Sequence, residues 1–143
     1  MKREYPETPL VGVGAVILHQ GSVVLVKRKF PPLAGEWSIP GGRLEIGETL
    51  REAVVREARE ETRLTVDPVE LLGVYDRLMR DEGGRILYHY VLIDFLCQRS
   101  TGELQAGGDA NDARWFSPEE IEKVSLLADT VQVVRLGFEK VRK

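Results

Sequence analysis

Residues 42–64 read GRLEIGETLREAVVREAREETRL, the most densely patterned segment of the chain. Thr49 and Glu52 have the spacing of a capping box, in which each side chain bonds to the other residue's backbone at the start of a helix. The pattern therefore predicts a helix over residues 50–62. Its buried face is predicted from apolar residues at helical spacing, namely Leu50, Ala53, Val54 and Ala58.

Three glutamates, Glu57, Glu60 and Glu61, lie on this helix at spacing i, i+3 and i+4. Their carboxylates share one face, within about 100° of arc, and like charges so placed cost roughly a few tenths of a kcal/mol per pair. A solvated acidic face is one interpretation. A site for Mg²⁺, which pairs protein carboxylates with substrate phosphates, is the other. The glutamates border the apolar stripe, which favours a cleft at the rim of the core. Their basic neighbours, Arg56 and Arg59, are predicted to point to other faces.

The segment Pro40-Gly41-Gly42 precedes this helix. We expect it to end a short strand and to open a loop toward the helix. Glycines let the backbone approach a ligand closely, so a carbonyl oxygen here is a candidate metal ligand. A plain tight turn is the alternative.

Apolar and alternating segments predict strands on both sides of the helix. Gln20-Gly21 and the turn at residues 81–84 each join two of them into a hairpin. Gly12 and Gly14 are interpreted as strand residues that need close backbone approach, and Asp67-Pro68 as a turn. The predicted strands are residues 11–18, 22–27, 36–39, 71–79, 85–97 and 113–116.

Two more helices are predicted near the end of the sequence. Ser117-Pro118-Glu119-Glu120 has a cap, a proline and a glutamate at the positions that start a helix. A last helix over about residues 130–141 is predicted to bury four apolar side chains at helical spacing: Val131, Val134, Phe138 and Val141. The order of elements predicts an α/β fold, with a mixed sheet covered by helices.

Composition narrows the class of protein. The chain has 143 residues, 20 basic and 23 acidic, with a net charge of −3. We expect an extended arm at residues 1–9 and one domain at residues 10–143. The sequence has no basic stripe of the kind that indicates nucleic-acid binding. No apolar run approaches the length of about 20 residues that a membrane span needs. The start of the sequence does not resemble a secretory signal, and the lone Cys97 fits a core position. A cytoplasmic location is expected.

The spacing of certain residues within the segment 42–64 resembles the Nudix box. That box consists of Gly, five residues, Glu, seven residues and Arg-Glu-U-x-Glu-Glu-x-Gly-U, where U is aliphatic. Six matches at these spacings arise by chance on the order of 10⁻⁷ per start position. The matching residues are Gly42, Glu48, Arg56, Glu57, Glu60 and Glu61.

Two positions depart from the box. Ala58 is small for an aliphatic site, and Arg63 replaces the last glycine. That glycine is expected to end the helix in the left-handed conformation, where an arginine costs about 1 kcal/mol or forces a different helix end. The resemblance continues in residues 37–42 and 112–116, so it covers about residues 10–141.

The resemblance implies an α/β/α sandwich with a mixed β-sheet, and it implies roles for the box residues. Glu57 would be a metal ligand or the general base, and Glu60 and Glu61 would bind metal. The carbonyl of Gly41 would be a further ligand. Glu48 and Arg56 would form an orienting ion pair.

The implied activity is hydrolysis of a pyrophosphate bond in a nucleoside diphosphate derivative, with Mg²⁺ or Mn²⁺ as cofactor. ADP-ribose, giving AMP and ribose 5-phosphate, is the favoured substrate. An 8-oxo-dGTP or other nucleoside triphosphate pyrophosphohydrolase is an alternative, and a non-catalytic nucleotide-sensing domain is another. The expected partner is a small-molecule nucleotide, with no nucleic acid and no membrane, and a homodimer is possible.

Contacts to this substrate are expected from residues around the box. Arg28 and Arg43 are candidates for the phosphates, and Trp37 for the base. In some Nudix enzymes a later loop supplies another acid. Asp109 is the preferred candidate here, ahead of Asp112 and Glu103.

Overall fold

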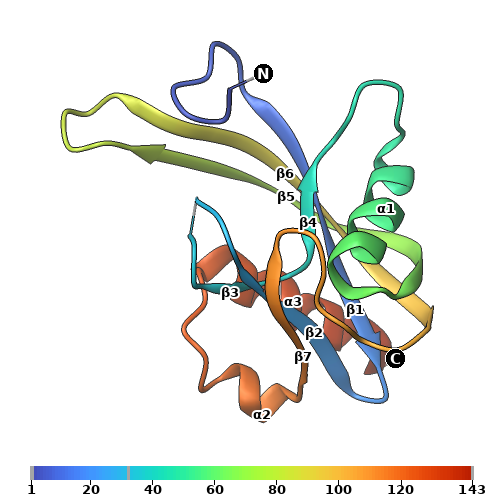
Figure 1. The fold of residues 1–143 in the computed structure, drawn as a ribbon. Helices are drawn as coiled ribbons and strands as arrows, with labels where there is room; N and C mark the ends of the chain where they lie inside the picture. Colours follow the sequence, from blue (N-terminus) through green and yellow to red (C-terminus); the bar gives the residue numbers. More distant parts are fainter. Residues whose placement is uncertain (1, 32, 143) are drawn as a thin grey trace.

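The computed structural model describes residues 2–31 and 33–142 (Figure 1). The strands are β1 (Leu10–His19), β2 (Ser22–Arg28), β3 (Trp37–Ser38), β4 (Gly41–Arg43), β5 (Thr65–Arg80), β6 (Ile86–Thr101) and β7 (Ala110–Phe116). The helices are α1 (Leu50–Thr62), α2 (Pro118–Ile121) and α3 (Ala128–Arg142). Across the described residues, none of these helices has both the length and the apolar character that a membrane crossing requires.

Strand β1 is the centre of the sheet. It runs parallel to β6 and antiparallel to β2 and β4. From β6 the sheet continues to β5, and from β2 it continues to β3 and β7, with antiparallel pairing throughout. The predicted mixed sheet is therefore confirmed.

Alternate residues of β1 pack under different helices. Val13, Ala15 and Ile17 belong to the core cluster that contains the buried side of α1. Val16 and Leu18 belong to the cluster that contains the buried side of α3. Because successive side chains of a strand point to opposite faces, each face of the sheet is covered by one helix, as Figure 1 shows. The α/β/α sandwich is confirmed.

Two predictions about the strands are wrong. Gly41–Arg43 does not open a loop but forms β4, with Gly14 opposite Gly41 and Gly12 opposite Arg43. Asp67-Pro68 is not a turn but lies inside β5, where the pairing with β6 shifts register. Proline is tolerated there because β5 is the last strand of the sheet, and an edge strand does not use every N–H.

The buried face of α3 also differs from the prediction. Val134 is buried as expected, but Val141 is 40% exposed. Gly137 lies in the contact with β1, where an added Cβ would stand 2.8 Å from Cγ1 of Val16. Val131 and Phe138 are only half-buried, and the absent side chain of Gly137 lets the helix approach the sheet closely and makes this glycine part of the buried face. The buried face consists of Thr130, Val133, Val134 and Gly137.

Helix α1 has the predicted bounds, and both of its ends follow from local chemistry. The capping box is confirmed: the Glu52 N–H donates to Thr49 Oγ1 (3.1 Å), and the Thr49 N–H donates to Glu52 Oε1 (2.8 Å). At the other end Arg63 has φ 66° and ψ 8°, the left-handed conformation, and its N–H donates to the Arg59 carbonyl (3.0 Å). The helix therefore ends as it would with glycine, although arginine occupies the position.

The segment before β1 is held against the turn between β5 and β6. The Tyr5 N–H donates to the Leu87 carbonyl (2.9 Å), and the Tyr5 hydroxyl donates to Asp81 Oδ2 (2.8 Å). The guanidinium of Arg85 lies 4.2 Å from the centre of the Tyr5 ring. These contacts fix where the chain enters β1.

Replacing Arg63 by glycine is expected to raise the free energy of unfolding by up to about 1 kcal/mol, because glycine adopts the left-handed conformation without a Cβ penalty. Arg63→Ala is the matched control, since it also shortens the side chain but keeps the Cβ. Urea unfolding followed by circular dichroism measures both. Equal stability of the two variants would show that the backbone of Arg63 carries no such cost.

Candidate active site

A cleft of about 880 Å³ opens where α1, the first half of β1, β4 and β6 meet, and the start of α3 closes one end of it. The lining includes most of the residues that the sequence analysis selected. Local sequence explains why they meet here. The Arg56 side chain ties α1 to the Arg43 carbonyl of β4, and the absent side chain of Gly42 leaves room for Glu57.

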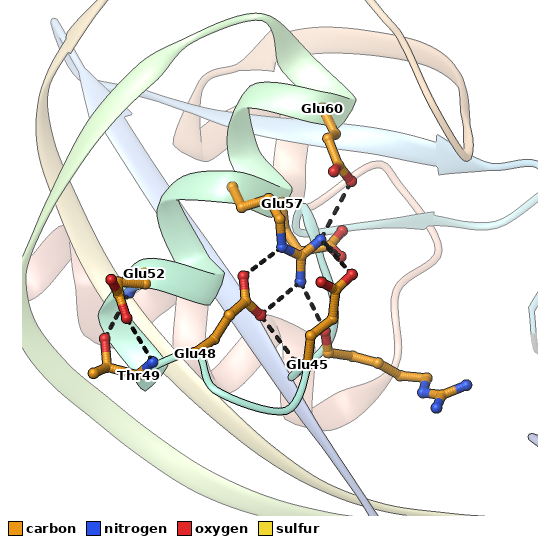
Figure 2. Close-up of polar contacts among 8 residues, drawn as sticks. Glu45, Glu48, Thr49, Glu52, Glu57 and Glu60 are labelled. Atoms are coloured by element: carbon orange, nitrogen blue, oxygen red, sulfur yellow. Dashed lines mark hydrogen bonds and ion pairs between the residues drawn. The ribbon is translucent and has the colours of Figure 1, made fainter. Parts of the chain in front are cut away.

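Glu48, in the loop that leads into α1, forms a two-pronged ion pair with Arg56 of the helix (Figure 2). Arg56 Nε donates to Glu48 Oε2 (2.5 Å), and Nη2 donates to Glu48 Oε1 (3.0 Å). Arg56 Nη2 also donates to the Arg43 carbonyl (3.0 Å), which ties the helix to β4. The Arg56 hydrogen bond holds the pKa of Glu48 below its usual value.

The same guanidinium also faces the glutamates of α1. Arg56 Nη1 donates to Glu57 Oε1 (2.8 Å) and to Glu60 Oε2 (3.4 Å). In Figure 2 the side chains of Glu48, Glu57 and Glu60 surround one guanidinium group. The prediction that Arg56 points to another face is therefore wrong, because a long side chain can curl back along the helix surface.

Glu61 is the buried member of the acidic group, and Glu57 is half-buried. Glu61 is only 4% exposed, and its Oε1 accepts the Gly41 N–H (2.8 Å). Burial raises the pKa of Glu61 to about 8, against the lowering effect of that hydrogen bond. Burial also raises the pKa of Glu57, whose side chain is 13% exposed. Glu60 is 53% exposed and lies at the outer rim.

The two glycines of β4 bring its backbone against these carboxylates. A Cβ on Gly42 would stand 2.6 Å from the Glu57 carboxylate, and one on Gly41 would stand 2.1 Å from the Val13 carbonyl oxygen. Backbone oxygens and buried carboxylates are the ligands that hard divalent cations prefer. Within residues 2–31 and 33–142 no three acidic, histidine or cysteine side chains already converge on one point. The donor chemistry and the space left by the missing Cβ atoms nevertheless fit such a cation.

The four residues proposed to contact substrate are placed differently. Arg28, Arg43 and Asp109 line the cleft. Asp109 is exposed and raises the pKa of both Glu57 and Glu61 through its charge. Trp37 does not occur in the described lining; its ring packs edge-on against Phe116, with 5.2 Å between ring centres. A contact of Trp37 with substrate therefore has no support from this cleft.

The other two acids considered for the loop lie elsewhere. Asp112 pairs with Arg114 (2.9 Å), and its Oδ1 accepts the Ala113 N–H (2.8 Å). Glu103 is exposed, and neither it nor Asp112 occurs in the described lining of the cleft. Asp109 is thus the acid of this loop that faces the box glutamates.

Sequence reasoning missed a second polar group at the far end of the cleft, formed by Arg77, Asp94, Asp129 and Thr130. Arg77 Nη2 lies 3.0 Å and 3.2 Å from the two carboxylate oxygens of Asp129. One signal was present in the sequence, because Asp94 interrupts the apolar run VLIDFLC at residues 91–97.

A family model described as the NUDIX domain matches residues 8–135. The chain belongs to the Nudix family. The ADP-ribose pyrophosphatase of Methanocaldococcus jannaschii is 41% identical over 117 residues, 82% of this chain and 67% of that protein. The chain therefore spans about two thirds of the length of this relative.

Two solved structures of Nudix proteins are similar in both fold and sequence. The MutT Nudix hydrolase of Burkholderia pseudomallei has a TM-score of 0.76 and 31% identity, over 94% of this chain and 99% of that one. The Nudix domain of Shewanella oneidensis NrtR, solved in complex with ADP ribose, has a TM-score of 0.77 and 25% identity, over 94% and 90% of the two chains. The resemblance to the Nudix box is confirmed at the level of the family, and the role of each box residue stays a prediction.

Gly42→Ala is expected to weaken Mn²⁺ binding by at least about tenfold, a usual effect of displacing the supports of a metal site. The added Cβ would stand 2.6 Å from the Glu57 carboxylate and would push this carboxylate away from the backbone of β4, out of the metal site. Isothermal titration calorimetry with Mn²⁺ measures the change.

Gly83→Ala, in the turn between β5 and β6, is the matched control. Its Cβ would lie at an ordinary 3.5 Å from Asp81 Oδ1. Unchanged Mn²⁺ affinity in Gly42→Ala would remove the backbone of β4 from the metal site.

Proposed function

We propose that this Nudix protein hydrolyses ADP-ribose to AMP and ribose 5-phosphate with the help of Mg²⁺ or Mn²⁺. The observation that carries the proposal is the buried carboxylate of Glu61 beside the half-buried carboxylate of Glu57, both packed against the glycine backbone of β4 inside a cleft lined by arginines. The archaeal relative named ADP-ribose pyrophosphatase and the similar Nudix domain solved with ADP ribose support this choice of substrate.

Glu60, Glu61 and the carbonyl of Gly41 would hold the cation, and Glu57 would stand beside it as the base. Once bound, the cation would neutralise charge on the diphosphate oxygens and favour attack on phosphorus. Arg56 would give up its contacts with Glu57 and Glu60 and keep those with Glu48 and with the Arg43 carbonyl, which tie the helix to β4. The buried Glu61 would remain tied to the Gly41 N–H.

The hydrolysis itself needs a base for the attacking water and positively charged groups that bind the phosphate oxygens. Glu57 is proposed to take a proton from the attacking water, since burial raises its pKa and makes it a better proton acceptor. The water oxygen bonds to one phosphorus as the bridging P–O bond breaks, and the other phosphate leaves with the electron pair. Arg28 and Arg43, which line the cleft, would hold the phosphate oxygens. Asp109 is the alternative base, and a homodimer stays a prediction.

Incubation of the protein with ADP-ribose and Mg²⁺ is expected to release AMP and ribose 5-phosphate in equal amounts, measured by ion-exchange chromatography. EDTA should stop the release. Turnover of 8-oxo-dGTP in place of ADP-ribose would show that the proposed substrate is wrong and that the proposed reaction, hydrolysis of a pyrophosphate bond, is right. No turnover of any nucleoside diphosphate derivative, together with tight binding of ADP-ribose, would identify a nucleotide-sensing domain instead.

Glu57→Gln is expected to lower kcat at least about 100-fold, the usual contribution of one general base, with the fold intact because glutamine has nearly the same shape. Glu82→Gln, at an exposed position in the turn between β5 and β6, makes the same chemical change away from the cleft and should leave kcat unchanged. An unchanged rate in Glu57→Gln, with loss of activity in Asp109→Asn, would assign the base to Asp109.

A further inference from the structure

Asp94 is a buried carboxyl at the end of the cleft that faces away from the box glutamates. It is only 6% exposed, yet it lines the cleft. Gly14, its neighbour on β1, makes room for it: a Cβ on Gly14 would stand 2.2 Å from Asp94 Oδ1. The close approach expected of a strand glycine thus serves to admit an acidic side chain.

The carboxyl of Asp94 forms no hydrogen bond or ion pair within the described part of the chain. Burial raises its pKa to about 7, and the charge of Asp129 adds to this, while Arg77 lowers it. Arg77 is itself hydrogen-bonded to Asp129. No side-chain oxygen in the described residues is both fully buried and without a partner, so the Asp94 carboxyl is accessible from the cleft and can accept hydrogen bonds from a bound ligand.

The groups around Asp94 extend this pattern. The ion pair of Arg77 and Asp129 lies at the same end of the cleft, and the Thr130 hydroxyl donates to Asp129 Oδ1 (3.4 Å). Together they offer carboxylate acceptors, a guanidinium donor and a hydroxyl. Such a mixture suits a ligand with several hydroxyl groups.

The sheet sets the distance between this end and the catalytic glutamates. Gly14 of β1 pairs with Gly41 on one side and with Asp94 on the other. Gly41 donates its N–H to Glu61. The backbones of Gly41 and Asp94 are therefore two strand spacings apart, about 10 Å. The box glutamates and Asp94 line the same cleft, so a group attached directly to a diphosphate held by these glutamates would extend along the cleft toward Asp94.

The lining favours a sugar over a nucleobase at this end. Tyr90 is the one aromatic side chain among the described residues of the cleft lining. It is 8% exposed and packs with Leu10 and Tyr88, so little of its ring is available for a base to stack on. A terminal ribose, which carries no base, has three free hydroxyl groups that need partners.

We propose that Asp94, with Arg77, Asp129 and Thr130, binds the hydroxyl groups of the terminal ribose of the substrate. The proposal rests on the proposed hydrolysis of ADP-ribose, but it can be tested separately because the product sugar phosphate binds without turnover. Asp94 is then a residue that determines specificity and takes no part in the chemical step.

The test measures binding of ribose 5-phosphate and 2-deoxyribose 5-phosphate in Mg²⁺ buffer, by calorimetry, with AMP and 2′-deoxy-AMP as nucleotide probes. We expect the wild type to bind ribose 5-phosphate about tenfold more tightly than the deoxy sugar, the effect of one hydrogen bond to a charged group. Asp94→Asn should reduce this ratio toward one without changing the ratio for the two nucleotides. Asp76→Asn, at an exposed position of β5, is the matched control and should behave as the wild type.

Three results would overturn the proposal. Equal weakening of both sugar phosphates would mean that Asp94 acts only through the shape of the cleft. An effect confined to the nucleotides would assign this end to the nucleoside. An unchanged ratio in Asp94→Asn would remove Asp94 from the site. Circular dichroism confirms folding, and sugar discrimination in a protein that does not cleave ADP-ribose would leave this inference standing while the proposed function fails.

Discussion

The packing of two carboxylates, buried Glu61 and half-buried Glu57, against the glycine backbone of β4 is the constraint on which this site depends. Glu57 and Glu61 reach the backbone of β4 because Gly41 and Gly42 have no Cβ, and the N–H of Gly41 is the hydrogen-bond donor of Glu61. Where water is largely excluded, desolvation disfavours the charged form of such acids. Arg56 offsets part of the unfavourable free energy of the charged carboxylates. The part that is not offset favours binding of a divalent cation beside them.

Arg56 links this constraint to the rest of the domain. One guanidinium contacts Glu48 before the helix, Glu57 and Glu60 on the helix, and the Arg43 carbonyl on β4. It therefore sets the position of α1 relative to the sheet as well as the geometry of the acids.

The opposite end of the helix is held by the loop before β7. The Gly107 N–H donates to the Glu61 carbonyl (3.1 Å), and the Gln105 N–H donates to the Thr62 carbonyl (3.0 Å). Docking of this loop on the helix end brings Asp109 to the cleft. Both ends of the helix thus contribute to the same site, one through an ion pair and the other through backbone hydrogen bonds.

Local patterns in the sequence were enough for α1, its caps, the hairpins and the acidic face, because helix ends and turns depend on neighbouring residues. Arg63 shows how far this extends, since the required backbone conformation is kept without glycine. Contacts between distant segments were beyond such patterns. The strand at Gly41, the buried face of α3 around Gly137 and the packing of Trp37 on Phe116 depend on what lies across the sheet. The same holds for Asp94, whose place in the cleft exists only because Gly14 of another strand leaves room for it.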